Sequence, residues 1–233
     1  MEDKAFYLSK TEFRVLASLE GAEQLYCFGL DQEEAPDREE EKLLQAILQI
    51  VKNGWGQLSG QGLELCGEMK ELVGSIVRAR FVAEAMDRTG GRTLCYFAET
   101  PALAEAAPDG SLRVGWLQPE SLSAWLIQRL SLGKAYWETE EDADEAALSS
   151  EAASLEKEKL ENGGLTGILS GQEAEIRFRD ARDGEIRDRY LWIQGALNLW
   201  IVHADGGGQV YSVLPDSAEG RKKTQKEWEE RIE

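Results

Sequence analysis

RTLCYFA, at residues 92–98, begins a pattern that the chain uses twice. The first copy continues with Asp109-Gly110, LRVGWL at 112–117 and Pro119, and the second copy consists of LWIVHA at 199–204, Asp205-Gly206, VYSVL at 210–214 and Pro215. Apolar runs bounded by Asp-Gly turns indicate strands, and proline suits the first turn of a helix. The pattern predicts an α+β fold in which an antiparallel sheet is built from two pseudo-twofold related halves. Each half is a strand meander plus a helix, with flanking helices.

Three helices are predicted before the first copy. Ser9 and Glu12 have the spacing of a capping box, which starts a helix near 10–20. An apolar stripe ending at Asn53-Gly54 predicts the second helix, and a shorter stripe over 69–77 predicts the third. Residues 77–86 fit helix or strand equally poorly. The glycines of 54–62 predict an irregular loop, and 101–110 is also expected to be a loop.

The second half is β-rich in the same way. Apolar and charged residues alternate over 174–179, and Asp183-Gly184 predicts a hairpin. Three further strands are expected at 190–193, 197–203 and 209–214, which completes a four-stranded meander. Trp228 and Ile232 are placed to hold down a charged final helix.

The expected division follows composition. We expect an N-terminal α+β half over 1–137, an acidic linker over 138–161, and a C-terminal half over 162–233, with the halves packed as one domain. A helix with apolar residues from Leu122 to Leu130 is expected after Pro119. The linker could hold a marginal helix between Leu148 and Leu155, although a flexible connector suits its charge better.

Charge restricts the partners. The formal net charge is -18, from 26 Lys and Arg against 44 Asp and Glu, and such a surface repels nucleic acid. We expect no secretory leader, because Met1-Glu-Asp-Lys-Ala-Phe lacks a basic region followed by an apolar segment, and no apolar run approaches the roughly 20 residues that a spanning helix needs. We therefore expect a cytoplasmic protein whose partner is another protein, with no nucleic acid bound and no stable membrane insertion.

Catalytic residues are scarce. His203 is the only histidine and lies in an apolar run, where a hydrogen-bonded structural role is expected. Cys27, Cys66 and Cys95 are widely spaced and fit small buried side chains rather than disulfides or a metal site. No cofactor, metal or catalytic residue is predicted. An enzyme that uses paired carboxylates in a cleft between the halves is the alternative.

Protein binding is the leading hypothesis. Trp55 and Leu58, on the glycine-rich stretch, are the predicted contact residues, because tryptophan is enriched in binding hot spots. The segment 39–65 also permits a winged helix, whose acidic surroundings favour a regulator that works through protein contacts.

The order of these elements resembles the EspG-like proteins, which are cytosolic chaperones associated with ESX, or type VII, secretion. The resemblance rests on LSKTEFRVLA at 8–17 leading to Phe28-Gly-Leu30, on the helix ending at Gly54-Trp55, and on the closing strands from Leu199 to Pro215. It implies a quasi-twofold α+β fold with a central sheet, and a non-enzymatic protein that keeps small helical secretion substrates soluble. The acidic linker and the short polar C-terminal helix depart from the family's pattern.

Overall fold

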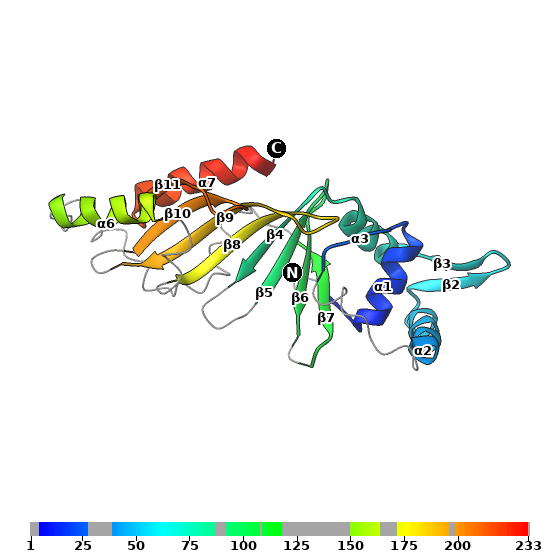
Figure 1. Cartoon of the computed structure of the whole chain (residues 1–233). Helices are drawn as coiled ribbons and strands as arrows, with labels where there is room; N and C mark the ends of the chain where they lie inside the picture. Colours follow the sequence, from blue (N-terminus) through cyan, green and yellow to red (C-terminus); the bar gives the residue numbers. More distant parts are fainter. Residues whose placement is uncertain are drawn as a thin grey trace. The chain divides into compact units, whose positions relative to one another are not determined.

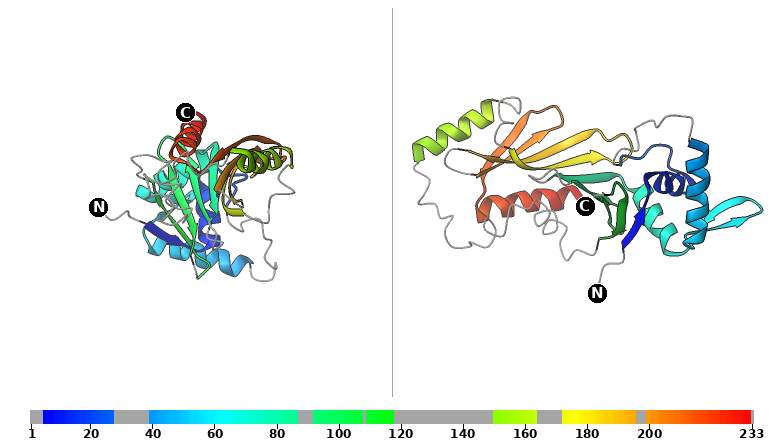
Figure 2. Two further views of the ribbon diagram at one scale, coloured as in Figure 1. Left: turned by 90° about the vertical axis from the view of Figure 1, so that its left-hand side faces the viewer. Right: turned by 90° about the horizontal axis from the view of Figure 1, so that it is seen from below.

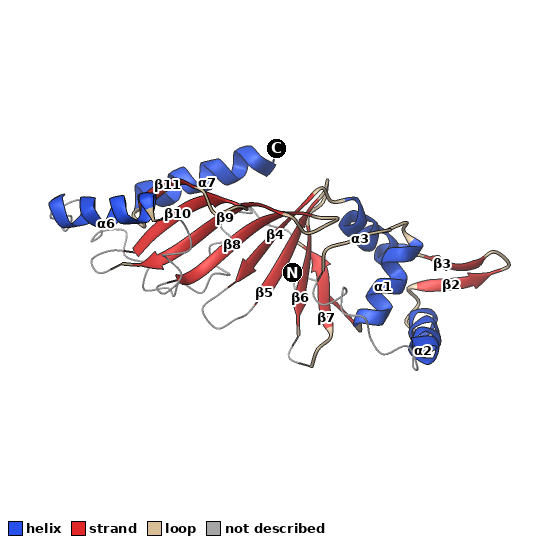
Figure 3. Cartoon of the chain, viewed as in Figure 1, coloured by secondary structure: helices blue, strands red, loops and turns tan. Residues whose placement is uncertain are grey.

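A computed structural model describes residues 5–27, 39–86, 92–107, 109–117, 150–163, 172–195 and 199–232. Its helices are α1 (Lys10–Leu19), α2 (Glu39–Lys52), α3 (Gly67–Arg78), α6 (Ser150–Asn162) and α7 (Ala218–Ile232). Its strands are β1 (Ala5–Leu8), β2 (Gly56–Ser59), β3 (Gly62–Leu65), β4 (Phe81–Met86), β5 (Arg92–Phe97), β6 (Ala102–Ala106), β7 (Leu112–Trp116), β8 (Gln172–Asp180), β9 (Ile186–Gln194), β10 (Leu199–Asp205) and β11 (Val210–Pro215). Figures 1 and 3 show the helices and strands along the chain.

The predicted α+β class is confirmed. Nine strands follow one another in the order β1-β7-β6-β5-β4-β8-β9-β10-β11, while β2 and β3 pair separately. Every strand pair with a described register is antiparallel. The chain forms two compact units. Unit 1 contains residues 1–83, 93–118 and 180–184, and unit 2 contains residues 84–92, 119–179 and 185–233.

Unit 1 has a core between sheet and helices. Ser9 accepts from the amide of Glu12 while Glu12 accepts from the amide of Ser9, so the predicted capping box starts α1. Phe13 and Leu16 then point into a core shared with α3 and the strands. The expected loop over 101–110 was wrong in part, since Ala102–Ala106 form β6 and pair with β5 and β7. Small alanines gave too weak a strand signal there.

Two further predictions for the N-terminal region are settled. α3 ends at Arg78 and Phe81–Met86 form β4, so the ambiguous segment is a strand after a helix. The glycine-rich stretch is not an irregular loop, because residues 56–59 and 62–65 form the β2–β3 hairpin. Gly62 takes a φ of 123° at the turn, which explains why a glycine occurs beside a regular strand.

Unit 2 contains the predicted four-stranded meander. β8, β9, β10 and β11 pair consecutively and antiparallel. On one face α7 packs through Trp228, which is 1% exposed and contacts the rings of Phe178, Tyr190 and Trp192. The prediction that Trp228 holds this charged helix in place is confirmed, and the side chain of Ile232, named with it, lies outside the described part of the chain. Figure 2 shows α7 along these strands.

The other face of the meander carries α6. Leu191, Trp200 and Val202 belong to a small core against which Leu160 of α6 packs. The indole nitrogen of Trp200 donates to Glu156 of α6 at 2.7 Å. The later part of the predicted acidic linker is therefore helical over 150–162.

Some predictions fall outside the described residues. These are the acidic loop at 31–38, the helix after Pro119, the earlier part of the linker, and the Phe28-Gly-Leu30 segment. Among the helices that the structure describes, none has the length and hydropathy needed to cross a membrane.

Candidate protein-binding surface

Helix α2 carries more apolar surface than unit 1 buries. At about 100° per residue, its apolar positions from Leu43 to Val51 cover an arc of about 200°. Ala46 and Ile50 are buried on one side of this arc. Leu44 and Leu48, on the other side, are 58% and 57% exposed. A helix that served only the core would place polar residues at these two positions.

The β2–β3 hairpin continues from the C-terminus of α2. Gly56 faces Leu63 and Ile50, and a Cβ at this position would lie 3.0–3.1 Å from both side chains. The missing side chain lets the hairpin approach α2 closely. Leu58 lies opposite Leu63 in the register and is 65% exposed. The apolar face of the hairpin thus extends from the core into solvent.

Trp55 joins the helix to the hairpin. Its amide donates to the carbonyl of Ile50 at 3.0 Å, and its carbonyl accepts from the amide of Cys66 at 3.1 Å. The indole packs edge-on against Phe6, with ring centroids 6.1 Å apart, and remains half-buried. Of the two predicted contact residues, Leu58 is exposed and Trp55 is half-buried at the junction between α2 and the hairpin.

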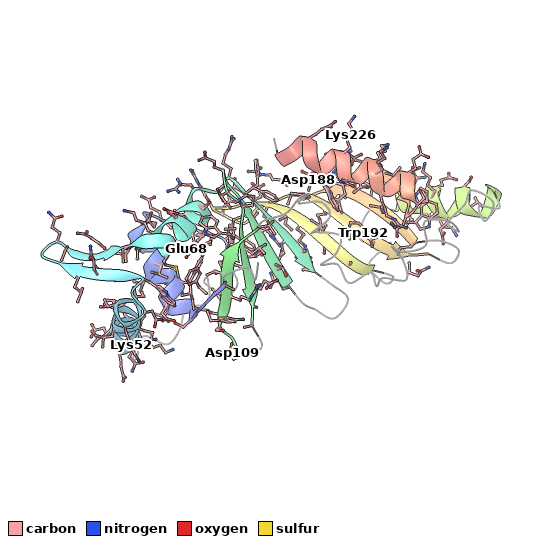
Figure 4. The ribbon with its side chains drawn as sticks, turned by 180° about the vertical axis from the view of Figure 1, so that it is seen from behind. Lys52, Glu68, Asp109, Asp188, Trp192 and Lys226 are labelled. Carbon is pink, nitrogen blue, oxygen red and sulfur yellow. The ribbon has the colours of Figure 1, made fainter. Side chains whose placement is uncertain are left out.

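We call the exposed side chains of Leu43, Leu44, Leu48 and Leu58 the leucine surface. All four belong to unit 1, and the two elements that carry them contact each other. Figure 4 marks Lys52 at the end of α2, close to the start of the hairpin. The sequence analysis named Leu58 as a contact residue and used the α2 stripe only to predict a helix. The width of that stripe was the signal for the exposed leucines.

A polar groove lies on another side of α2. It has a volume of about 770 Å³ and is lined by the start of α1, by α2 and by the 109–111 turn. Ser9 and Glu12 in its wall are already bonded to each other's amides, and Asp109 accepts from the amide and hydroxyl of Ser111. These local bonds use the polar groups to cap the helix and the turn.

His203 has the structural role that its sequence context predicted. Its Nε2 lies 3.0 Å from Asp188 and its Nδ1 lies 3.7 Å from Glu227 of α7. The ring stacks on Tyr190 with centroids 4.4 Å apart. A Ser–His pair needs one ring nitrogen to accept from the hydroxyl, whereas both nitrogens of His203 lie against carboxylates. The histidine thus links α7 to the sheet.

Two buried carboxylates in unit 2 lie among arginines. Glu84 accepts from Arg92 and Arg179, and Glu175 accepts from Arg177 and Arg189 at 2.8 and 2.6 Å. Both glutamate side chains are inaccessible to solvent. Burial alone would raise the pKa of each carboxyl, but the arginines outweigh it and lower both pKa values. A general acid needs a raised pKa, so these pairs suit structure rather than proton donation.

Asp216 behaves in the opposite way. It precedes α7, and its carboxylate lies 3.1 Å from Nε of Arg221. Burial raises the pKa of Asp216 to about 6, against the opposing effects of Arg221 and Trp192. A raised carboxyl pKa can mark a functional site, but here the group is enclosed at the helix start, with its side chain 3% exposed.

The Gly206-Gly207-Gly208 turn binds an internal carboxylate. The carboxylate of Asp205 accepts from the amide of Gln209 at 2.9 Å, and amides of Gly207 and Gly208 help to lower its pKa. Phosphate-binding loops direct such amides at a ligand. In this turn the chain's own aspartate takes that place, as expected for a structural turn.

Comparisons with known proteins bear on the fold of this chain. No family model matches the chain, and no curated protein matches it. A solved structure does match, that of the Mycobacterium tuberculosis type VII secretion system chaperone EspG5 in complex with the PE25–PPE41 dimer. This chain resembles EspG5 in fold. The TM-score is 0.54 at 9% sequence identity, over 96% of this chain and 95% of the EspG5 chain.

The match to EspG5 confirms the EspG-like resemblance derived from the order of elements. At 9% identity the likeness concerns the fold and transfers no individual residue. The α+β architecture is therefore shared with a chaperone. The leucine surface, by contrast, is an observation on this chain alone.

Proposed function

We propose that this protein is a non-enzymatic chaperone or adaptor that holds a secretion substrate in the cytosol, as an EspG-like protein would. The leucine surface is the observation that carries the proposal. The EspG5-like fold supports it, because the matching structure is that of a type VII secretion system chaperone in complex with the PE25–PPE41 dimer. Together they favour a protein client over a small molecule.

Among the residues that the structure describes, the side chains of Leu44, Leu48 and Leu58 belong to no buried core. Isolated exposed leucines are common on soluble proteins, but a group on two adjoining elements is typical of an interaction site. Covering a leucine side chain with a client contributes about 1.5–3 kcal/mol for full burial. Leu58 would contact the client directly, and Trp55 would hold the hairpin in the orientation that presents it.

The acidic composition suits the same role. A net charge of -18 favours solubility of a protein with exposed leucines, because it opposes large-scale association of copies. A client with an apolar contact surface and a basic rim would be attracted to this chain. Small helical secretion substrates, of the kind that EspG5-like proteins would hold, are the client class that we propose.

The direct test is co-expression with candidate substrate dimers from the same cell, followed by purification on a tag carried by this chain. Leu58→Gln should reduce recovery of the client strongly without unfolding the chain. Leu155→Gln is the matched control, because Leu155 of α6 is 55% exposed and lies in the other unit. Equal recovery with both variants would reject Leu58 as a contact. No stoichiometric client with the unaltered chain would reject the chaperone proposal itself.

We also propose the internal symmetry that the sequence echo predicted. The sheet order places β4 beside β8, and the strands β4–β7 and β8–β11 then follow in sequence order on either side. This order supports two equivalent meanders, separated along the chain by the acidic stretch at 138–161. The sequence echo paired β5 and β7 with β10 and β11. In the correspondence that the sheet order supports, β6 and β7 would match β10 and β11 instead.

A further inference from the structure

Helix α2 presents a seam that has the spacing of a helix-pairing surface. Glu41, Leu44, Leu48 and Val51 are separated by three, four and three residues, which is the a/d spacing of paired helices. Leu44 and Leu48 form the exposed centre of this seam, and Val51 is half-buried beside them. Lys52 follows Val51 and is also exposed.

The charges at the two ends of the seam are complementary to each other. Glu41 and Lys52 lie within about 20° of each other around the helix axis, at opposite ends of α2. Consider a second α2 that lies antiparallel to the first, with Leu48 of the second copy opposite Leu44 of the first. Each residue then faces the residue of the other copy whose number, added to its own, gives 92. Glu41 of one copy then lies opposite Val51 and beside Lys52 of the second copy. The twofold axis repeats this ion pair at the other end.

We infer that the α2 seam is a surface for self-association, and that its occupant is the antiparallel α2 of a second copy of this chain. The antiparallel arrangement also sets the dipoles of the two helices in opposition, which is favourable. An isologous contact of this kind needs a self-complementary patch, and α2 supplies one in its leucines and in its terminal charges. The inference does not rest on the proposed function.

The strength of this dimer is limited by size and charge. α2 has 14 residues, so one helix pair buries less than the roughly 1,200 Å² of a stable standard interface. Two copies that each carry a net charge of -18 repel each other at low ionic strength. Salt screens that repulsion while leaving the leucine contact intact. The dimer should therefore be weak, and it should become tighter as salt is raised.

Sedimentation velocity of the full chain tests the inference. Runs from about 5 to about 500 µM, at about 50 and about 500 mM salt, should show a monomer–dimer equilibrium that favours the dimer at high salt. Leu44→Gln with Leu48→Gln should raise the dissociation constant at least about tenfold. Leu155→Gln on α6 should leave it unchanged. Circular dichroism and thermal melting of each variant confirm that the compared proteins are folded.

Charge reversal identifies the arrangement. Glu41→Lys alone and Lys52→Glu alone should each weaken the dimer, since each creates like charges at both ends of the seam. The double reversal should restore association, because it exchanges the two partners. A monomer at every concentration and salt, or a dimer that the leucine substitutions leave intact, would overturn the inference. The leucine substitutions could instead abolish client capture and leave self-association unchanged. That result would assign the seam to the client.

Discussion

Helices α2 and α7 differ in how much of their apolar surface they bury. α2 contains Leu43, Leu44 and Leu48 and leaves all three exposed. α7 is far more polar, yet its Trp228 is buried among the rings of Phe178, Tyr190 and Trp192. The difference shows that apolar content alone does not tell which helix the fold depends on. Surplus apolar surface on α2 is available for binding, while a single tryptophan anchors α7.

The largest expected effect is on the α7 side. Trp228→Ala removes the side chain that fills the space between α7 and the sheet, and large-to-small changes of this kind cost about 3–5 kcal/mol. Urea denaturation followed by circular dichroism measures the loss. Leu48→Gln on α2 should change the free energy of unfolding by less than about 0.5 kcal/mol. Similar losses for both substitutions would remove the contrast between the helices.

The arginine-bound glutamates should give the next largest effect. Glu84→Gln leaves the neighbouring arginines without their buried carboxylate, which costs about 3 kcal/mol near neutral pH. Because the folded pKa of Glu84 is lowered, its contribution to stability is present above its ordinary value of 4.5 and is lost as the pH falls below it. The variant should therefore approach the unaltered protein in acid. A constant difference from pH 7 to pH 3, measured by denaturation, would contradict this linkage.

Asp216, at the start of α7, should show the reverse slope. Its folded pKa is raised from 3.8 to about 6, so the folded state binds more protons than the unfolded state between these values. Deprotonation of this group therefore lowers the free energy of unfolding as the pH rises from about 4 to about 6. Relative to the unaltered protein, Asp216→Asn should gain up to about 3 kcal/mol between pH 4 and pH 7. The free energy of unfolding is measured against pH for both proteins, and subtracting one curve from the other removes the contributions of the buried glutamates, which are the same in both. A difference that does not change with pH would contradict the raised pKa of Asp216.

The smallest effect on stability is expected for the hairpin. Leu58→Gln replaces an exposed side chain, so the melting temperature should hardly move. Trp55→Ala should cost about 1–2 kcal/mol, since the half-buried indole packs on Phe6. Differential scanning calorimetry of the two variants separates a contact residue from a supporting one. A larger loss for Leu58→Gln would reverse the roles that we assign.

Periodicity predicted most of the regular structure. The capping box of Ser9 and Glu12, the stripes of α2 and α3, and the alternation that leads into β8 depend on near neighbours in the sequence. β6 was missed because its alanines carry little strand preference, and their burial depends on partners from β5 and β7. The β2–β3 hairpin was missed because its glycines suggested irregular backbone, whereas Gly56 permits a close approach to Ile50.

The candidate surface was only half predictable for a related reason. Leu58 could be chosen from its place in a glycine-rich stretch, but the exposure of Leu44 and Leu48 depends on which side of α2 faces the core. That orientation is set by contacts with α1 and the hairpin, which no local pattern encodes. The arginine partners of Glu84 also come from two strands that are far apart in the sequence, β5 and β8.

The three glycines after β10 should differ in their tolerance to substitution when random variants are selected for folding. A side-chain carbon at position 206 would lie 1.9 Å from the carbonyl oxygen of Ile186, and Gly208 has a φ of 92°. Gly207 has neither restriction, since its nearest neighbour is a carboxylate oxygen of Asp205 at 3.3 Å. Selection for folded protein should therefore keep glycine at the first and third positions and accept many residues at the second. The three glycines thus have different reasons for their identity: steric contact at Gly206, a positive φ at Gly208, and neither at Gly207.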